Sequence, residues 1–156
     1  MNSIRERIIR EIIRRIETKA FDNVAFDRIT RGEIPDDYNG GQGSILAVLE
    51  GRETFGATAA RASENDLEVF LSFAVPLADG EVAATVSNNV SAELVKALAG
   101  QHQMQEGGDG DALSCIVQAV ASEPNVLADG DECATGIVEY RLKYRTNARD
   151  PFAAVQ

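Results

Sequence analysis

Two stretches of the chain repeat hydrophobic side chains at the spacing of a helix. In the first, isoleucines return every three or four positions, which predicts a helix from about Ser3 to Ala20 with one apolar stripe. The stripe consists of Ile4, Ile8, Ile9, Ile12, Ile13 and Ile16. Ser3 can cap the start of this helix, and Glu6 three positions later completes a capping box.

The second helical stretch lies between about Glu81 and Ala99, where apolar residues return every four positions and Gly100 provides a stop. These apolar residues are Val82, Val86, Val90, Leu94 and Leu98. The polar run from Ser87 to Asn89 is a poor helix former, so the pattern also permits a start as late as Ser91.

Four other stretches have the pattern of β-strands. The last of them, Thr135 to Thr146, alternates most regularly, and its inward positions are Val138, Tyr140, Leu142 and Tyr144. The other three are Ser44 to Glu50, Asp66 to Leu77 and Leu113 to Ala121. The segments between the predicted elements are rich in glycine and polar residues and are expected to be loops and turns: 21–43, 52–65, 101–111 and 123–132.

The predicted order is helix, strand, strand, helix, strand, strand. This α-β-β-α-β-β order is typical of an α+β fold in which the helices cover one face of a mostly antiparallel sheet. The length of 156 residues fits one domain, so residues 1–156 are expected to share a single core, with 147–156 as a C-terminal arm. The opposite face of the sheet would carry Arg141, Lys143 and Arg145, so this face is exposed or is buried by a neighbouring molecule.

Charge is distributed unevenly along the chain. Residues 1–31 carry eight basic and five acidic side chains, a net charge of +3, and the remainder carries seven basic and twenty acidic ones, a net charge of −13. Binding to a nucleic-acid backbone requires a basic face, so the acidic bulk argues against a tight DNA or RNA binder. No apolar run approaches the roughly 18 residues needed to cross a bilayer, and no targeting segment is expected.

The candidate chemistry is sparse, so we expect no enzyme activity, no cofactor and no metal. His102 is the only histidine and falls in a predicted polar loop, without the partners of a nucleophilic triad. Two acidic runs, Asp109 to Asp111 and Asp129 to Glu132, lack the spacing of a calcium loop and are expected to be turns. Cys115 and Cys133 are expected to be small buried thiols, although a disulfide between them stays open at this stage.

The first predicted helix has a charged face opposite its isoleucines. Arg7, Arg10 and Arg14 lie on this face together with Glu11 and Glu17, and Arg7 can pair with Glu11 one turn later. One interpretation is a core helix with a solvated face. The other is that the arginines form a contact surface for an acidic neighbouring subunit.

The C-terminal sequence resembles a known family. The run VEYRLKYRTN at Val138 to Asn147, followed by ARDPF at Ala148 to Phe152, resembles the closing strand and tail of tail-terminator and tail-completion proteins of long-tailed bacteriophages, of siphovirus or myovirus type. The opening helix, the pair Arg31-Gly32 and the pair Glu50-Gly51 are similar to features of the same family. The middle of the chain, 57–105, carries no matching signature.

This resemblance implies a structural virion protein that is assembled in the host cytoplasm. Such a subunit forms a ring, typically a homohexamer, at the head-proximal end of the tail tube, where it ends polymerisation and meets the neck or head-completion protein. DNA would only pass through the ring, and an acidic bore would keep it from adhering. The expected subunit contacts are the helix arginines Arg7, Arg10 and Arg14, the strand residues Arg141, Lys143 and Arg145, and the arm residues Arg149, Asp150 and Phe152.

Two other classes of function stay open from the sequence. The chain could be a non-viral α+β protein-binding or adaptor module whose basic strand face recognises a partner. It could also be an enzyme with an unfamiliar site, which would require a concave pocket that holds carboxylates or His102.

Overall fold

The computed structural model describes residues 2–59, 62–104, 113–124, 132–147 and 149–154. Within these residues it has two helices and seven strands. The helices are α1 (Ile4–Thr18) and α2 (Ala83–Leu98). The strands are β1 (Arg28–Arg31), β2 (Ile45–Ala59), β3 (Ala62–Pro76), β4 (Gly100–Met104), β5 (Leu113–Pro124), β6 (Cys133–Asn147) and β7 (Asp150–Ala154).

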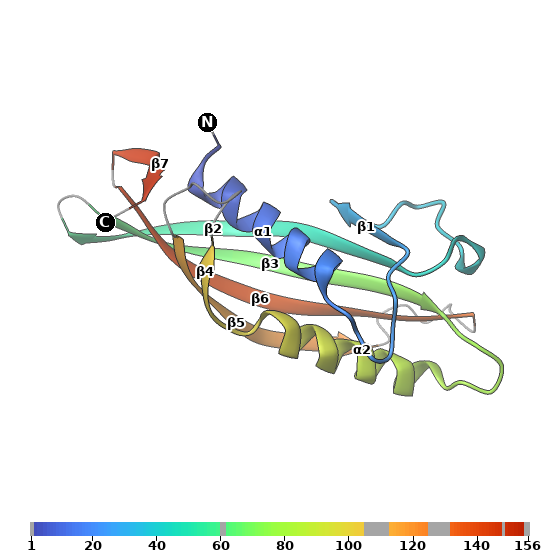
Figure 1. Cartoon of the computed structure of the whole chain (residues 1–156). Coiled ribbons are helices and arrows are strands. Elements are labelled where there is room, and N and C mark those ends of the chain that lie inside the picture. The colour runs from blue at the N-terminus through green and yellow to red at the C-terminus, as the bar shows by residue number, and fades with distance from the viewer. Residues whose placement is uncertain (1, 60–61, 105–112, 125–131, 148, 155–156) are drawn as a thin grey trace.

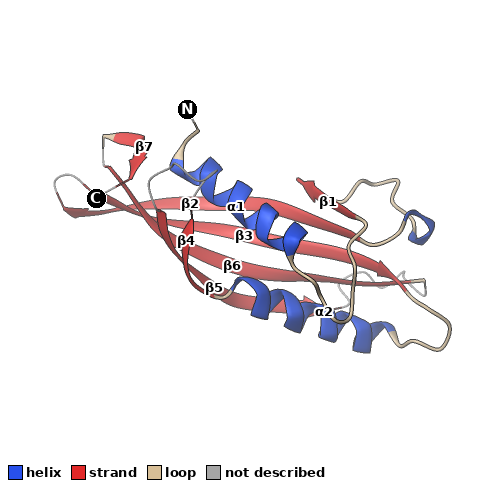
Figure 2. Cartoon of the chain, viewed as in Figure 1, coloured by secondary structure: helices blue, strands red, loops and turns tan. Residues whose placement is uncertain are grey.

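The strands form one sheet with the order β1-β2-β3-β6-β5-β4, and β7 pairs with the end of β6. Every neighbouring pair is antiparallel except β1 and β2, which are parallel. Both helices lie on the same side of the sheet (Figures 1 and 2). The predicted α+β class, with helices on one face of a mostly antiparallel sheet, is confirmed.

The isoleucine stripe places α1 on the sheet. Five of its six isoleucines are at most 2% exposed, and Ile13 is partly buried beside them. The Ser3 side chain caps the helix by accepting a hydrogen bond from the Glu6 amide, 3.2 Å away. The Glu6 side chain does not complete the predicted capping box, because its carboxylate binds Arg10 and Arg31 instead. Helix α2 begins at Ala83, close to the earlier of the two predicted starts.

The alternation predicted for the last strand is confirmed in β6, which lies between β3 and β5. Val138, Tyr140, Leu142 and Tyr144 are buried toward the helices. Arg141, Lys143 and Arg145 are exposed on the opposite face, which no helix of the described chain covers. We call this side the open face.

The predicted order lacked three strands and misjudged one hairpin. β1, β4 and β7 each contain only four or five residues and lie at the rim of the sheet, in segments expected to be loops or an arm. The stretch 52–65 was expected to be turns, but it extends β2 and β3 into a long hairpin. Its small and polar residues adopt strand conformation because they pair across the hairpin, as Phe55 does with Asn65 and Gly56 with Glu64.

The two cysteines are too far apart for a disulfide within one chain. Cys115 pairs with Tyr144 near the end of β6, whereas Cys133 begins this strand, so the thiols are about 36 Å apart along it. Cys115 is fully buried and burial raises the pKa of its thiol to about 12, which keeps it unreactive. Cys133 is only partly buried, so the expectation of a buried thiol holds for Cys115 alone. No helix in the described ranges is long and apolar enough to cross a membrane.

Candidate assembly surfaces

A network of ion pairs fixes the first turn of α1 to the edge of the sheet. The Arg5 guanidinium binds Glu50 through Nε at 2.8 Å and Glu53 through Nη1 at 3.1 Å. Both carboxylates lie on β2 and are less than a fifth exposed. Tyr144 on β6 also donates a hydrogen bond from its hydroxyl to Glu53. Because three elements meet at these carboxylates, the network sets the position of α1 relative to the sheet.

A second arginine extends this network to β1. Arg31 donates from Nε to Glu50 at 2.6 Å and from Nη1 to Glu6 at 2.7 Å. Glu6 also accepts from Arg10 at 2.7 Å. These hydrogen bonds, first from Arg31 and then from Arg10, lower the pKa of the Glu6 carboxyl.

The charged face of α1 is largely paired within the helix. Arg14 binds Glu11 with two hydrogen bonds of 2.6 and 2.7 Å, and Arg15 binds the same carboxylate at 2.9 Å. Glu11 therefore forms ion pairs with the arginines three and four positions later in the helix. Arg10 and Arg14 are exposed but already hold carboxylates, and Arg7 is partly buried. An acidic partner would have to share these arginines with Glu6 and Glu11.

These pairs predict a loss of stability in acid. The hydrogen bond from Arg14 lowers the pKa of Glu11, as Arg31 does for Glu6, below the ordinary value of 4.5. Carboxyls with a lowered folded-state pKa stabilise the fold above their unfolded value, and this stabilisation is lost as the pH falls through the folded-state pKa. Urea denaturation at about pH 6 and about pH 3 should show the loss. The difference should shrink in the Glu6→Gln/Glu11→Gln variant, and an unchanged difference would contradict this explanation.

The open face carries two columns of opposite charge. In the β3–β6 register, Glu64 lies opposite Arg145, Asp66 opposite Lys143 and Glu68 opposite Arg141. Arg145 and Glu64 approach to 3.6 Å, and Arg141 and Glu68 to 3.9 Å. Exposed pairs of this kind contribute about 0–1 kcal/mol each, so they add little to stability. Their main effect is to neutralise the basic row that the sequence placed on this face.

The C-terminal segment folds back on its own chain. After a turn in which Asn147 Oδ1 accepts from the Arg149 amide at 3.0 Å, β7 pairs with β6 at Thr146 and Asn147. Asp150 Oδ1 accepts from the Phe152 amide at 2.9 Å, and the Phe152 side chain is 43% exposed. Contact of this arm with another subunit stays a prediction.

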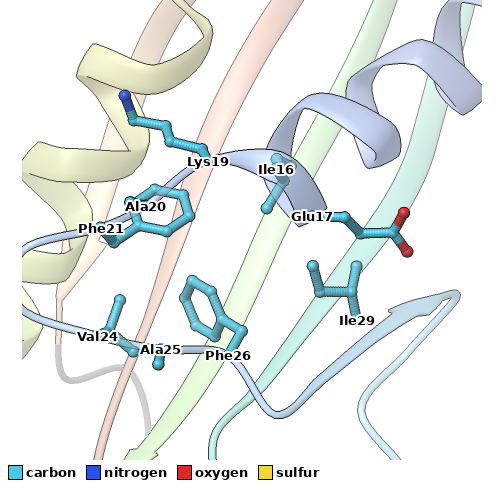
Figure 3. Close-up of a pocket in the computed structure, with 9 residues that line it drawn as sticks. All are labelled: Ile16, Glu17, Lys19, Ala20, Phe21, Val24, Ala25, Phe26 and Ile29. Atoms are coloured by element: carbon cyan, nitrogen blue, oxygen red, sulfur yellow. The ribbon is translucent and has the colours of Figure 1, made fainter.

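A hollow lies where α1 ends and the chain turns toward β1 (Figure 3). It has a volume of about 340 Å³ and is lined by Ile16, Glu17, Lys19, Ala20, Phe21, Val24, Ala25, Phe26 and Ile29. The Phe21 and Phe26 rings pack edge to face at a centroid distance of 5.7 Å. The Asp22 and Asn23 amides donate to Glu93 on α2, at 3.1 and 2.9 Å, so the loop that forms one wall is held in place.

The most exposed large hydrophobic side chain of the described residues is Phe55, at 70%. It lies near the tip of the β2–β3 hairpin, in a stretch of β2 that extends beyond β1, since β1 pairs only with Ile45–Val48. At this register β3 is itself paired with β6, so Phe55 lies on the free edge of the sheet, and water-exposed aromatic rings of this kind are often found at contact sites.

The described residues contain no cluster of metal ligands. No group of three or more His, Cys, Asp or Glu side chains could hold a metal ion there. His102, expected in a loop, lies in β4 and pairs with Cys115 on β5. The acidic run 109–111 lies outside the described residues, as does the run 129–132 except for Glu132. The raised pKa of Tyr140 follows from burial, which favours the neutral hydroxyl.

The structure distributes the predicted contact residues over three surfaces. Arg7, Arg10 and Arg14 lie on α1, Arg141, Lys143 and Arg145 on the open face, and Arg149, Asp150 and Phe152 around β7. The sequence alone indicated neither the exposed Phe55 side chain nor the hollow beside α1. The signal for Phe55 was an aromatic residue in a polar stretch, which indicates a contact site only once that stretch is known to be a hairpin.

No protein-family model matches the chain, and no curated protein matches it. Among solved structures, 18 chains match. One, a protein without a functional name, aligns over 90% of this chain and 94% of its own, with a TM-score of 0.52 and 18% identity. Another, from the virion of a native gene transfer agent particle, aligns over 92% of both chains with a TM-score of 0.46 and 12% identity. The first shows that this α+β fold recurs in a solved protein, and we draw no conclusion from the second.

Proposed function

We propose that the protein is a structural virion subunit that forms a ring, with six copies as the expected number, at the head-proximal end of a phage tail tube. In this role it ends tube polymerisation and presents a surface to the neck or head-completion protein. The proposal starts from the sequence resemblance of the closing strand and its tail. The observation that carries it is the placement of that closing strand, β6, in the interior of a single sheet whose helices cover one face and leave the other open.

The charge pattern suits passage of DNA without adhesion. The paired columns of the open face leave no unopposed basic row among the described strands, and the chain as a whole has a net charge of −10. A bore formed by such subunits would repel a polyanion weakly and uniformly. The same pairing weakens the alternative of an adaptor that uses a basic strand face, because that face is charge-balanced.

Assembly state is the direct test of this function. Native mass spectrometry of the purified protein should show a discrete species of six times the 16.8 kDa chain mass, either alone or after addition of tail tubes that lack their end protein. Electron microscopy of such tubes should show density added at one end only. A monomer at every concentration that also fails to bind tubes would contradict the proposal.

A further inference from the structure

Two stretches of the sheet edge have no neighbouring strand among the described residues. β1 covers β2 only at Ile45–Val48, so residues 49–59 of β2 pair with β3 alone. At the other edge, β4 covers β5 only at Leu113–Val117, so residues 118–124 pair with β6 alone. The outward backbone N–H and C=O groups of both stretches therefore lack a strand to bind, and such edges readily pair with a strand of another molecule.

Exposed apolar side chains gather on the same two strands. Five large hydrophobic side chains of the described residues are exposed, and three of them lie on β2 or β5: Phe55 at 70%, Ile116 at 52% and Val120 at 47%. Phe55 and Val120 fall inside the uncovered stretches. The last four residues of β5, 121–124, are also all exposed, although alternate residues of a strand point to opposite faces. Both faces of this end of β5 are therefore accessible to a partner.

The two uncovered edges fit each other in direction. β2 and β5 run in opposite directions, because the pairs β2–β3, β3–β6 and β6–β5 are all antiparallel. They lie on opposite sides of the sheet (Figure 1), so one chain cannot pair them with each other. When a second copy continues the sheet in the same orientation, its β5 lies antiparallel to β2 of the first copy. This contact joins unlike patches, and such contacts close into rings when the rotation between copies permits.

One antiparallel register joins the two uncovered stretches without displacing the short rim strands. It places Ala59 of one copy opposite Gln118 of the next, and Glu53 opposite Pro124. β2 then ends where β4 begins to cover β5. β1 also stays in place, because the pairing stops at Glu53, beyond the last position that β1 covers.

The same register matches the faces of the two strands. It places Phe55 opposite Ser122, and residues that lie opposite each other in a sheet share a face. Within its own chain Phe55 pairs with Asn65 and Ser122 with Val138, both of which are buried on the helix side. Val120 lies two positions before Ser122, so the pairing would gather two exposed apolar side chains at one junction.

An unpaired charge of opposite sign lies on each uncovered stretch. Arg52 on β2 and Glu123 on β5 are exposed, and neither side chain forms an ion pair within the part of the chain that the structure describes. The recorded hydrogen bond of Arg52 uses its backbone amide. In this register Glu123 lies opposite Thr54, so Arg52 is its diagonal neighbour across the contact. A charge pair at this position would guide the orientation of the two copies.

The contact offsets successive copies along the strands, as a closed ring of tilted strands requires. Within one chain, Ser122 lies at the level of Val48, through the registers of β6 and β3. In the contact it lies opposite Phe55, and the bulge between Glu50 and Glu53 takes up one position, so the offset is about six residues, or roughly 20 Å. The four strands β2, β3, β6 and β5 span about 19 Å. The strands would therefore tilt about 45° from the ring axis, a tilt typical of closed barrels.

We propose that residues 53–59 of β2 in one copy pair antiparallel with residues 118–124 of β5 in a second copy, and that this pairing joins successive subunits of the ring in one continuous sheet. The inference rests on the proposed function, because it names the partner of each free edge as the neighbouring copy in that ring. It assigns Arg52 and Glu123 as the charges that set the register.

Exchange of these two charges tests the contact. Arg52→Glu and Glu123→Arg each place like charges across the junction, so each alone should weaken self-association by about 10-fold. The double variant restores opposite charges and should regain most of the association. Lys143→Glu, an exposed position on the central strand β6, should leave it unchanged. Sedimentation of the purified proteins, or tube binding where assembly requires tubes, measures the change, and all variants should keep the melting temperature of the monomer.

Directed crosslinking tests the register. In a Cys133→Ser background, where the remaining Cys115 is buried, Thr54→Cys and Glu123→Cys place thiols on opposite residues of the two strands. With a short bismaleimide, the double variant should give a ladder of covalent oligomers that ends at the ring size, and each single variant should give at most dimers. The matched control pairs Thr54→Cys with Ile116→Cys, a position that β4 covers about 24 Å further along β5, and should give no ladder.

The outcomes separate the two proposals. Rings that form normally with Arg52→Glu and give no crosslinked ladder would overturn the strand contact and leave the ring function standing. Loss of tube binding in Arg52→Glu with unchanged self-association and no ladder would assign the β2 edge to another protein and would also overturn the contact. Monomers under all conditions, with no binding to tail tubes, would overturn both proposals. A ladder that continues into open fibres would support the contact and contradict the ring.

Discussion

Replacement of Arg5 by methionine should lower the free energy of unfolding by about 2–3 kcal/mol. Methionine keeps the length and the packing of the aliphatic stem, so the loss isolates the charged group. Without the guanidinium, Glu53 remains 11% exposed with Tyr144 as its other recorded partner, and Glu50 depends on Arg31. A carboxylate held in a partly buried position without its cation has a large desolvation cost, and this cost is the main source of the predicted loss.

The matched control is Arg10→Met on the same helix. Arg10 binds Glu6 at 2.7 Å, but its side chain is 56% exposed, so this replacement should cost less than about 0.5 kcal/mol. Adding Glu53→Gln to Arg5→Met should recover part of the stability, because a neutral amide still accepts from Tyr144 and needs no cation. Urea denaturation of the four proteins measures these values. Equal small losses for Arg5→Met and Arg10→Met would show that the Arg5 ion pairs contribute no more to stability than an exposed ion pair does.

Local periodicity was sufficient to predict the elements that bury a continuous stripe. The isoleucines of α1, the four-residue spacing of α2 and the alternation of β6 each encode one buried face, so their positions follow from the sequence alone. Short rim strands carry no such stripe. β4, with the sequence GQHQM, is a strand because β5 supplies its hydrogen bonds, and that information is tertiary.

The surfaces were predicted less completely than the fold, for a related reason. The outward direction of Arg141, Lys143 and Arg145 followed from alternation, but their charge balance depends on the register that places Glu68, Asp66 and Glu64 opposite them. This register is a long-range property, set by how β3 and β6 bury their other faces. Phe55 is a similar case, because its exposure follows from its place on β2 beyond the end of β1, which only the fold shows.

Replacement of Gly136 by alanine should destabilise the protein by about 1–3 kcal/mol, although alanine in a strand ordinarily stabilises by about 0.5–1 kcal/mol. Gly136 lies on β6 directly opposite Phe73 of β3, on the face covered by α2. A Cβ atom there would lie 2.6 Å from Cζ and 2.8 Å from Cε1 of the Phe73 ring, and 3.2 Å from Ser87 Oγ of α2. Phe73 is 1% exposed and Ser87 is fully buried, so neither can move into solvent.

The buried hydrogen bond from Ser87 Oγ to the Thr135 carbonyl adds to this constraint, because it ties α2 to the residue next to Gly136. Displacing the helix to admit a methyl group would stretch that buried bond. Removing part of the ring should relieve the overlap, so Gly136→Ala combined with Phe73→Leu should cost less than the sum of the two single replacements.

Gly56 provides the control for the sign of the effect. A Cβ atom at this position on β2 would lie 3.5 Å from the Glu64 carbonyl oxygen, an ordinary van der Waals distance. Gly56→Ala should therefore raise stability slightly, by about 0.5 kcal/mol, through the lower entropy of the unfolded chain. Opposite signs for the two glycines in urea denaturation would establish that close packing between α2 and the sheet, rather than the backbone preference of glycine, requires Gly136. A gain in stability from Gly136→Ala would show instead that α2 can move away from β6 at little cost.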